Sequence, residues 1–171
     1  VITITSPSPG LHNSNSLNIA ASASEPVTNW QYSINGNPPV SFTPPQLVSF
    51  PQGAITLTVS ATDVLGLPGS SRVQFTVDSV APVVTPQTTL YPGSQTAAKN
   101  TDTVTLQATV TDATSGVASV TVDASALGCG ILTMTSGSPY QVQCPLFGAR
   151  DGTHSLTVTA TDVAGNPATA S

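Results

Sequence analysis

The sequence predicts an all-β chain that folds as two antiparallel β-sandwiches in tandem. The first observation is an internal repeat: LTVSATDVLG at Leu57–Gly66 returns as LTVTATDVAG at Leu156–Gly165, 99 residues later. That spacing is the length of a small domain rather than of a solenoid repeat. Apolar residues also alternate with Ser and Thr, which is typical of strands with one buried face. Finally, 15 prolines and 13 glycines leave no run with helical spacing. One continuous barrel is less favoured, because the repeat divides the chain in half.

Each copy contains its own alternating runs, and we expect their apolar faces to form its core. In the first copy the face of Trp30 carries the largest side chains and should supply the bulkiest part of that core. The expected faces of the first copy are Leu17, Ile19, Ala21, Ala23; Trp30, Tyr32, Ile34; Ile55, Leu57, Val59, Ala61; and Val73, Phe75, Val77. Those of the second copy are Val104, Leu106, Ala108, Val110; Ala118, Val120, Val122; and Leu156, Val158, Ala160.

The composition excludes several classes of function. The 171 residues include three basic and eight acidic side chains, and charged residues make up 6% of the chain. A nucleic-acid surface needs clustered Lys and Arg to neutralise phosphates, so nucleic acid is not an expected partner. The apolar residues occur in short alternating runs, and none approaches the roughly 18 residues of a membrane helix. We therefore expect no membrane span.

Several motifs together resemble bacterial immunoglobulin-like domains of the Big type, which occur in tandem in surface adhesins, stalks and some secreted enzymes. GAITLTVSATDVLG and GTHSLTVTATDVAGN are similar to that family's penultimate strand and turn, NWQYSING to its third strand, and DATSGVASVTVD to the loop and third strand of the second copy. The resemblance implies immunoglobulin-like domains over residues 1–79 and 80–171. VDSVAP at Val77–Pro82 resembles the joint between such domains. It contains no glycine, and Pro82 restricts both its own φ and the conformation of Ala81, so we expect a short, stiff linker.

The sequence contains no pattern typical of an enzyme. The lipase-type nucleophile motif, the zinc-binding HExxH, CxxC and phosphate-binding glycine loops are all absent. His12 and His154 have no neighbouring nucleophile or second ligand, and His154 occupies the place that Ile55 holds in the first copy. We therefore expect His154 to be a strand-edge or partly buried imidazole. No enzymatic activity is predicted.

Two cysteines bracket a segment that favours a hairpin. If Ser136-Gly137 forms a two-residue turn, Cys129 and Cys144 lie directly across from each other. Such a pair suits a disulfide only at a non-hydrogen-bonded position, and the alternative is two buried free thiols. A disulfide would indicate an oxidising, extracellular or cell-surface setting. The face that the two cysteines would share also carries Ile131, Tyr140 and Val142.

The acidic residues are concentrated at the ends of predicted strands. In an immunoglobulin-like scheme Asp78, Asp112 and Asp162 meet at one pole of the second domain, while Glu25 and Asp63 form a weaker, two-acid counterpart in the first. Like charges held together need a cation or a hydrogen-bond network, and Ca²⁺ takes six to eight oxygen ligands. The hypothesis is a Ca²⁺ site at the three-acid pole. The alternative is that each aspartate closes an Asx-turn without metal. No other cofactor is expected.

Two classes of function follow from the resemblance. The favoured one is a non-enzymatic structural module at the cell surface, a spacer, stalk or fibre segment whose partners are adjacent domains or neighbouring subunits. The alternative is an adhesin module that binds glycan or protein through loop aromatics. The candidates for such contacts are Phe42, Phe50, Tyr91 and Phe147, each of which could equally plug the core under a loop.

The repeat also predicts a gap at the end of the second domain. With the 99-residue offset, Val73, Phe75 and Val77 correspond to positions 172, 174 and 176, beyond Ser171. We expect the last core strand of the second domain to be missing, which leaves a groove and an unpaired sheet edge. Either the natural chain continues, which is favoured, or another chain supplies the strand. In the second case VITIT at the N-terminus is a candidate donor, and head-to-tail donation would build a filament.

Overall fold

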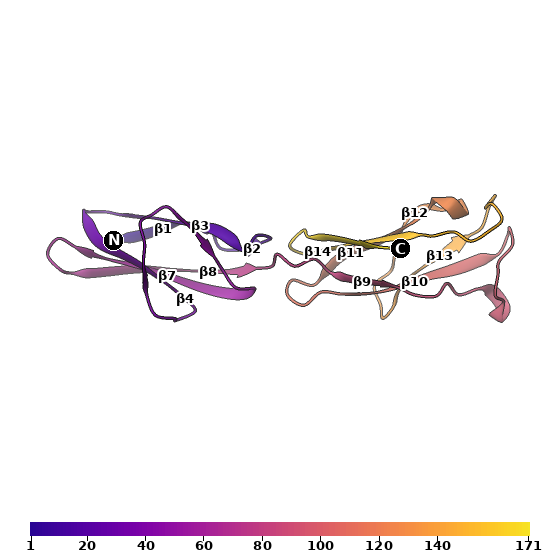
Figure 1. Cartoon of the computed structure of the whole chain (residues 1–171), viewed down its shortest axis with the longest axis horizontal. Coiled ribbons are helices and arrows are strands. Elements are labelled where there is room, and N and C mark those ends of the chain that lie inside the picture. Colours follow the sequence, from indigo (N-terminus) through magenta and orange to yellow (C-terminus); the bar gives the residue numbers. More distant parts are fainter. The chain divides into compact units, whose positions relative to one another are not determined.

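The computed structural model describes residues 1–171, apart from the side chain of Ser94. The chain divides into two compact units, Val1–Ser79 and Val80–Ser171. Both consist of β-strands (Figure 1), with two short 3-10 helices, η1 (Pro92–Ser94) and η2 (Ser125–Leu127), in the second unit. The prediction of an all-β fold is confirmed.

The first unit contains two sheets, as a sandwich requires. Strands β1, β3 and β6 form one sheet, and the other has the order β2-β8-β7-β4-β5. All pairs are antiparallel except β2 with β8. The bounds are β1 (Ile2–Ser6), β2 (Leu11–His12), β3 (Ser16–Ala23), β4 (Val27–Ile34), β5 (Val40–Ser41), β6 (Gln46–Ser49), β7 (Gly53–Asp63) and β8 (Pro68–Val77).

The core of the first unit lies where alternation places it, since successive side chains of a strand point to opposite faces. All four expected residues of β7 are buried. The bulkiest buried side chains are however Phe42, Phe50 and Phe75. Trp30 and Tyr32 are only partly buried and pack edge-on against Phe42, with ring centroids 6.3 and 5.3 Å away. The expectation for the Trp30 face is corrected in this respect, because Phe42 and Phe50, which follow the short strands β5 and β6, close the core together with Phe75 of β8.

The second unit repeats this plan with a smaller strand set. Its sheets have the orders β13-β10-β9 and β12-β11-β14-β15, and every pair is antiparallel. The bounds are β9 (Val83–Pro86), β10 (Thr103–Thr111), β11 (Val117–Ala124), β12 (Gly130–Thr133), β13 (Tyr140–Pro145), β14 (Thr157–Asp162) and β15 (Pro167–Ala170).

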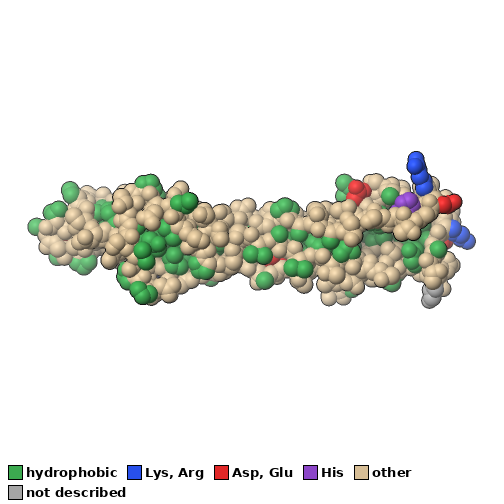
Figure 2. All heavy atoms as spheres, viewed as in Figure 1, with side chains coloured by type: hydrophobic (Ala, Val, Ile, Leu, Met, Phe, Trp, Pro, Cys, Tyr) green, Lys and Arg blue, Asp and Glu red, His purple; other side chains and the backbone are tan. Residues whose placement is uncertain are grey.

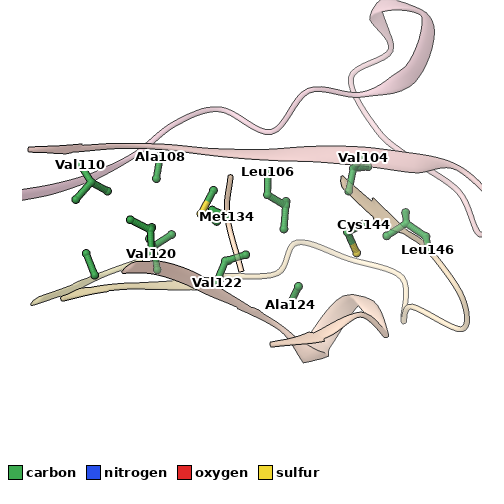
Figure 3. Close-up of a cluster of buried hydrophobic side chains, with 12 residues drawn as sticks. Val104, Leu106, Ala108, Val110, Val120, Val122, Ala124, Met134, Cys144 and Leu146 are labelled. Atoms are coloured by element: carbon green, nitrogen blue, oxygen red, sulfur yellow. The ribbon is translucent and has the colours of Figure 1, made fainter. Parts of the chain in front are cut away.

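The core of the second unit is built from facing side chains of β10 and β11. Figure 3 shows Leu106 and Ala108 of β10 pointing toward Val120 and Val122 of β11. Ala118 was expected on this buried face but is exposed, and Val117 packs against the core instead. The reason is a register shift between Val117 and Ser119, where a β-bulge interrupts the alternation.

The predicted hairpin between the two cysteines is wrong. The strand after Cys129, β12, pairs with β11, whereas β13, which contains Cys144, pairs with β10 in the other sheet. The chain between them crosses from one sheet to the other, and only the isolated bridge Thr135–Gln141 joins its two arms. Ile131 is consequently exposed and does not share a face with the partly buried Tyr140 and Val142.

Strand β15 occupies the position next to β14, where the sequence analysis expected the last core strand to be missing. Residues Pro167–Ala170 pair with β14 from Thr161 back to Val158. The corresponding strand of the first unit, β8, continues along the whole of β7 to Gly53. The pairing of β14 with β15 runs from Thr161–Pro167 to Val158–Ala170.

Candidate functional site

The three aspartates predicted to share a pole belong to different units: Asp78 lies in the first, and Asp112 and Asp162 lie in the second. Asp78 follows β8, Asp112 follows β10, and Asp162 is the last residue of β14. Asp78 and Asp162 are buried, with 0% and 1% of their surface exposed, and Asp112 is partly buried. That Asp78 shares a site with Asp112 and Asp162 stays a prediction.

Asp112 organises the loop between β10 and β11. Its Oδ1 accepts backbone N–H bonds from Thr114, Ser115 and Gly116 at 3.1, 2.9 and 2.7 Å. This is the Asx-turn arrangement, in which a short acidic side chain replaces a backbone acceptor. The Asx-turn thus uses one of the two carboxylate oxygens of Asp112.

Asp162 closes the turn between β14 and β15. Its Oδ1 accepts the backbone N–H of Asn166 at 2.8 Å, and its Oδ2 accepts the Asn166 side-chain amide at 2.7 Å. Burial opposes ionisation of this carboxyl. The Asn166 amide and the backbone N–H groups of Asn166, Gly165 and Ala164 outweigh burial and lower the pKa of Asp162. Asp162 is therefore an ionised acid that is held by its own turn.

The counterpart in the first unit has the same turn but a different neighbourhood. Asp63 Oδ1 accepts the backbone N–H groups of Leu65 and Leu67, both at 2.8 Å. Glu25 lies 3.9 Å from the α-amino group of Val1, and both groups are exposed. Among the residues with described side chains, neither Glu25 nor Asp63 joins a group of three potential metal ligands.

Cys129 and Cys144 form a disulfide, with their Cα atoms 5.9 Å apart. Cys144 is fully buried on β13, and Cys129 directly precedes β12. Because β12 and β13 belong to different sheets, the bond joins the two sheets of the second unit. The sequence predicted the bond correctly, although through the wrong pairing of strands.

Neither histidine lies in a catalytic arrangement. His154 donates from Nε2 to the carbonyl of Arg150 at 2.8 Å, and His12 donates to the carbonyl of Ser8 at 2.9 Å. His12 also packs edge-on against Phe75, with ring centroids 5.4 Å apart. These contacts fit the structural role that we expected of His154.

The four loop aromatics divide into two kinds. Phe42 and Phe50 are buried in the first unit, and Tyr91 packs partly buried against the core of the second. Phe147 is 68% exposed on the loop after β13. Of the four candidates for ligand contact, Phe147 is thus the one whose ring is mostly exposed to solvent.

A groove in the second unit was not foreseen as a binding site. It consists of a cavity of about 460 Å³ and a smaller one of about 220 Å³, which share Thr89, His154 and Leu156 in their walls. Lys99 and Arg150 line the larger cavity, and Ser171 lines the smaller. Its lining residues are spread from Pro86 to Ser171, so no local motif in the sequence marked it.

The remaining surface offers little charge. Figure 2 shows uncharged polar and hydrophobic side chains over most of the face drawn, with few acidic or basic groups. No helix among the described residues is long and apolar enough to span a membrane.

Comparison with known proteins places the fold. A family model for the bacterial Ig-like domain matches residues 82–171, which is more than half of the chain. A search of curated proteins found no match. Among solved structures, the chain is similar to fibronectin(III)-like modules of Clostridium thermocellum CbhA, with 22% identity, a TM-score of 0.46, and coverage of 99% of this chain and 91% of that one.

It is also similar to the SGBP-B protein of a Bacteroides ovatus mixed-linkage glucan utilization locus, solved in complex with a mixed-linkage heptasaccharide. There the identity is 14% and the TM-score 0.36, with 98% of this chain and 66% of that chain covered. At such TM-scores neither likeness bears on function. The sandwich topology and the match over residues 82–171 lead to one conclusion: the chain belongs to the bacterial Ig-like domain family.

Proposed function

We propose that the chain is a non-enzymatic, extracellular structural module, a spacer or stalk segment of a bacterial surface protein. The proposal rests on the hydrogen bonds of the acidic and histidine side chains, which are made to the nearby backbone. Asp63, Asp112 and Asp162 each bind the backbone of their own turn, and both histidines bind a carbonyl four residues earlier. Side chains that bind the nearby backbone stabilise the fold and do not form a reaction centre. The disulfide supports an oxidising location.

The partners of such a module are adjacent domains of the same protein or neighbouring subunits. A glycan array and a panel of host-matrix proteins, probed with the whole chain, test the proposal. The spacer role requires that no probe binds the chain above background. A reproducible, saturable hit that Phe147→Ala abolishes would replace the spacer role by that of an adhesin.

We further propose that Asp78, Asp112 and Asp162 hold Ca²⁺. Oxygens that bind one Ca²⁺ at about 2.3–2.6 Å lie no more than about 5 Å apart. The proposal rests on three acids that each follow a strand in a chain with eight acidic residues. Backbone carbonyls and water would complete the six to eight ligands. Neutralising three adjacent carboxylates would stabilise the fold around them.

Thermal unfolding with Ca²⁺ and with a chelator tests the metal proposal. Asp112→Asn keeps an oxygen that accepts the N–H bonds of Thr114 to Gly116 but removes the charge. We expect Ca²⁺ to raise the Tm of the parent chain and not that of Asp112→Asn. The matched control is Asp123→Asn, which alters an exposed Asx-turn to Ser125 outside the cluster. Equal transitions with Ca²⁺ and with chelator at low ionic strength would exclude the site.

A second candidate function is binding of a glycan or protein by the second unit. The observation that favours it is the cavity of about 460 Å³, whose wall includes Tyr91, Lys99, Arg150 and Asp151. Two of the three basic residues of the chain lie there. The double variant Lys99→Ala/Arg150→Ala should then abolish any hit found on the array, whereas Arg72→Ala, in the first unit, should not.

Filament assembly by donation of β1 to another copy is a weaker alternative. Ile2 of β1 is buried in its own unit, and β1 pairs with β3 from Ile2 to Ser6. Donation would first have to detach this strand and expose the position that it fills. The structural spacer needs no such exchange.

A further inference from the structure

Strand β12 is an end strand of its sheet. It pairs with β11, and no other strand among the described residues pairs with its second side. In an antiparallel pair, every second residue directs its N–H and C=O groups away from the partner strand. The N–H of Met134, directly after β12, donates to the Val120 carbonyl at 2.9 Å. Two residues earlier, Leu132 faces β11 in the same way. Ile131 and Thr133 therefore direct their backbone groups to the open side.

The other end strands of the sheets have proline beside or within them. Proline lacks a backbone N–H, and proteins use it to prevent a sheet edge from pairing with another chain. The four described sheets have eight end strands, and seven of them contain a proline or have one within two residues. These prolines are Pro7 (β1), Pro9 (β2), Pro39 (β5), Pro45 (β6), Pro82 and Pro86 (β9), Pro139 and Pro145 (β13) and Pro167 (β15). Strand β12 has none, and it carries no charged residue.

The first unit has the same edge in a blocked form. Strand β5 ends its sheet beside β4 and β7, as β12 does beside β11 and β14. The N–H of Phe42, directly after β5, donates to the Trp30 carbonyl at 3.0 Å, so Phe42 has the place of Met134. Three residues before Phe42, Pro39 has the place of Ile131. The two corresponding edges thus differ at a position that faces outward, where one has proline and the other an N–H donor.

The side chains of β12 also leave apolar surface at this edge. Ile131 is 73% exposed on the outer face of the sheet. Leu132, on the inner face, packs against the core but is only partly buried. A strand added beside β12 would cover part of both side chains, and burial of aliphatic surface is favourable.

We propose that β12 pairs antiparallel with β12 of a second copy of the chain, about a two-fold axis at Leu132. Ile131 of each copy then lies opposite Thr133 of the other, and four N–H···O bonds join these residues. Each copy presents two N–H and two C=O groups at this edge, and the pairing satisfies all of them. The contact is the same patch on both copies, so it closes as a dimer and does not propagate.

A second copy is favoured over an unrelated peptide because the edge is self-complementary. The register that satisfies the four outward groups of each copy is symmetric about Leu132. It makes the two Leu132 residues a non-hydrogen-bonded pair, in which cross-strand side chains are closest. The Asp123 carboxylates, opposite Ile131 on β11, would lie three strand spacings apart. That is about 14 Å, beyond the Debye length of about 8 Å at physiological ionic strength.

Sedimentation equilibrium of the whole chain up to about 1 mM tests the proposal. The contact is small, so we expect a weak dimer with a Kd of about 0.1–1 mM. Ile131→Pro copies the first unit, and Thr133→Pro removes the other outward N–H. Both leave the bonds to β11 in place, because prolines are tolerated on edge strands where the N–H faces solvent. Each should raise the Kd by at least about tenfold in a chain whose circular dichroism and Tm show that it is folded.

Two controls accompany the proline variants. Ser41→Pro changes the residue of β5 that has the place of Thr133, and it should leave the Kd unchanged. Ile131→Thr keeps the N–H and shortens the side chain, so it should weaken the dimer less than Ile131→Pro does. A parent chain that stays monomeric at about 1 mM would overturn the proposal. So would a dimer that both folded proline variants retain.

Cysteine substitution tests the register. Leu132→Cys should form a disulfide-linked dimer on mild oxidation, because a non-hydrogen-bonded antiparallel pair has the spacing that a disulfide needs. Thr133→Cys should link more slowly, although Thr133 is the more exposed residue, because the pairing places it opposite Ile131 and not opposite itself. Faster linkage by Thr133→Cys would overturn the two-fold pairing. The dimer depends neither on the spacer role nor on bound Ca²⁺, so its failure would leave both of those proposals standing.

Discussion

Asp162 and Asn166 are joined by three hydrogen bonds across the turn between β14 and β15. The carboxylate accepts the backbone N–H and the side-chain amide of Asn166 at 2.8 and 2.7 Å, and the backbone N–H of Asp162 donates to the Asn166 carbonyl at 3.2 Å. In the first unit Asp63 and Leu67 make only the backbone part of this arrangement. The repeated aspartate is thus a turn residue in both units, with a side-chain clamp added in the second.

Removing the clamp should destabilise the second unit. Asn166→Ala deletes a charge-assisted bond to a buried carboxylate, and we expect a loss of about 1–3 kcal/mol in the free energy of unfolding. Leu67→Ala is the matched control, because Leu67 has the equivalent place in an exposed turn and should change stability by less than about 0.5 kcal/mol. Denaturant unfolding of both variants measures the difference. Similar losses would show that the side-chain bond contributes nothing.

The lowered pKa of Asp162 predicts a pH dependence in the acid range. Its ionised form is favoured by folding, so the stabilisation is present above the unfolded pKa of about 3.9 and is lost as pH falls through the lower folded pKa. Melting of the second unit in chelator should become steeply pH-dependent below about pH 4. Asp162→Asn should flatten that dependence. An unchanged pH profile in Asp162→Asn would contradict the assignment.

Reduction of the disulfide should weaken the second unit alone. The bond closes a loop with a sequence separation of 15, for which the chain-entropy model gives about 3 kcal/mol. The double variant Cys129→Ser/Cys144→Ser should reproduce the effect of reductant and be insensitive to it. The transition of the first unit serves as an internal control and should stay in place. Alkylation with intact-mass analysis should find no free thiol in the native chain, and two would refute the bond.

Truncation of two corresponding leucines should lower the free energy of unfolding by different amounts. Leu57 is 0% exposed, so Leu57→Ala should destabilise the first unit by about 3–5 kcal/mol. Leu156, its counterpart beside the groove, is partly exposed, and Leu156→Ala should cost about 1–2 kcal/mol. Equal losses by denaturant unfolding would mean that Leu156 is as well packed as Leu57.

Truncation of two loop aromatics, Phe50 and Phe147, should also change stability by different amounts. Phe50 is 2% exposed, and Phe50→Ala should cost about 3–5 kcal/mol by loss of contacts and creation of a cavity. Phe147→Ala should leave the Tm of the second unit within about 2 °C, since the ring is mostly in solvent. A large loss at Phe147 would show that the ring supports its loop.

The parts of the fold that could be predicted from sequence are those governed by alternation. Leu57, Val59, Val104 and Leu106 are all buried as expected, because a regular strand buries every second residue. Ala118 was misplaced because one extra residue in a bulge reverses the alternation, and no local composition announces it.

The site was predictable to the extent that strand ends determine it. Asp112 and Asp162 each close the turn after their strand, as the Asx-turn alternative expected, whereas a site shared with Asp78 stays a prediction. The hairpin around Cys129 and Cys144 failed for the opposite reason. Whether a strand pairs with its sequence neighbour or crosses to the other sheet is decided by the whole core, not by a possible turn at Ser136-Gly137.

The cross-link between Cys129 and Cys144 also limits how far the second unit lengthens under tension. A separation of 15 residues corresponds to about 50 Å of fully drawn-out chain, at 3.3–3.6 Å per residue. While the bond is intact, that length stays inside the covalent loop and cannot be released, however completely the sheets come apart. Oxidation therefore sets the extension that one ruptured unit adds to a pulled chain, separately from the force needed to rupture it.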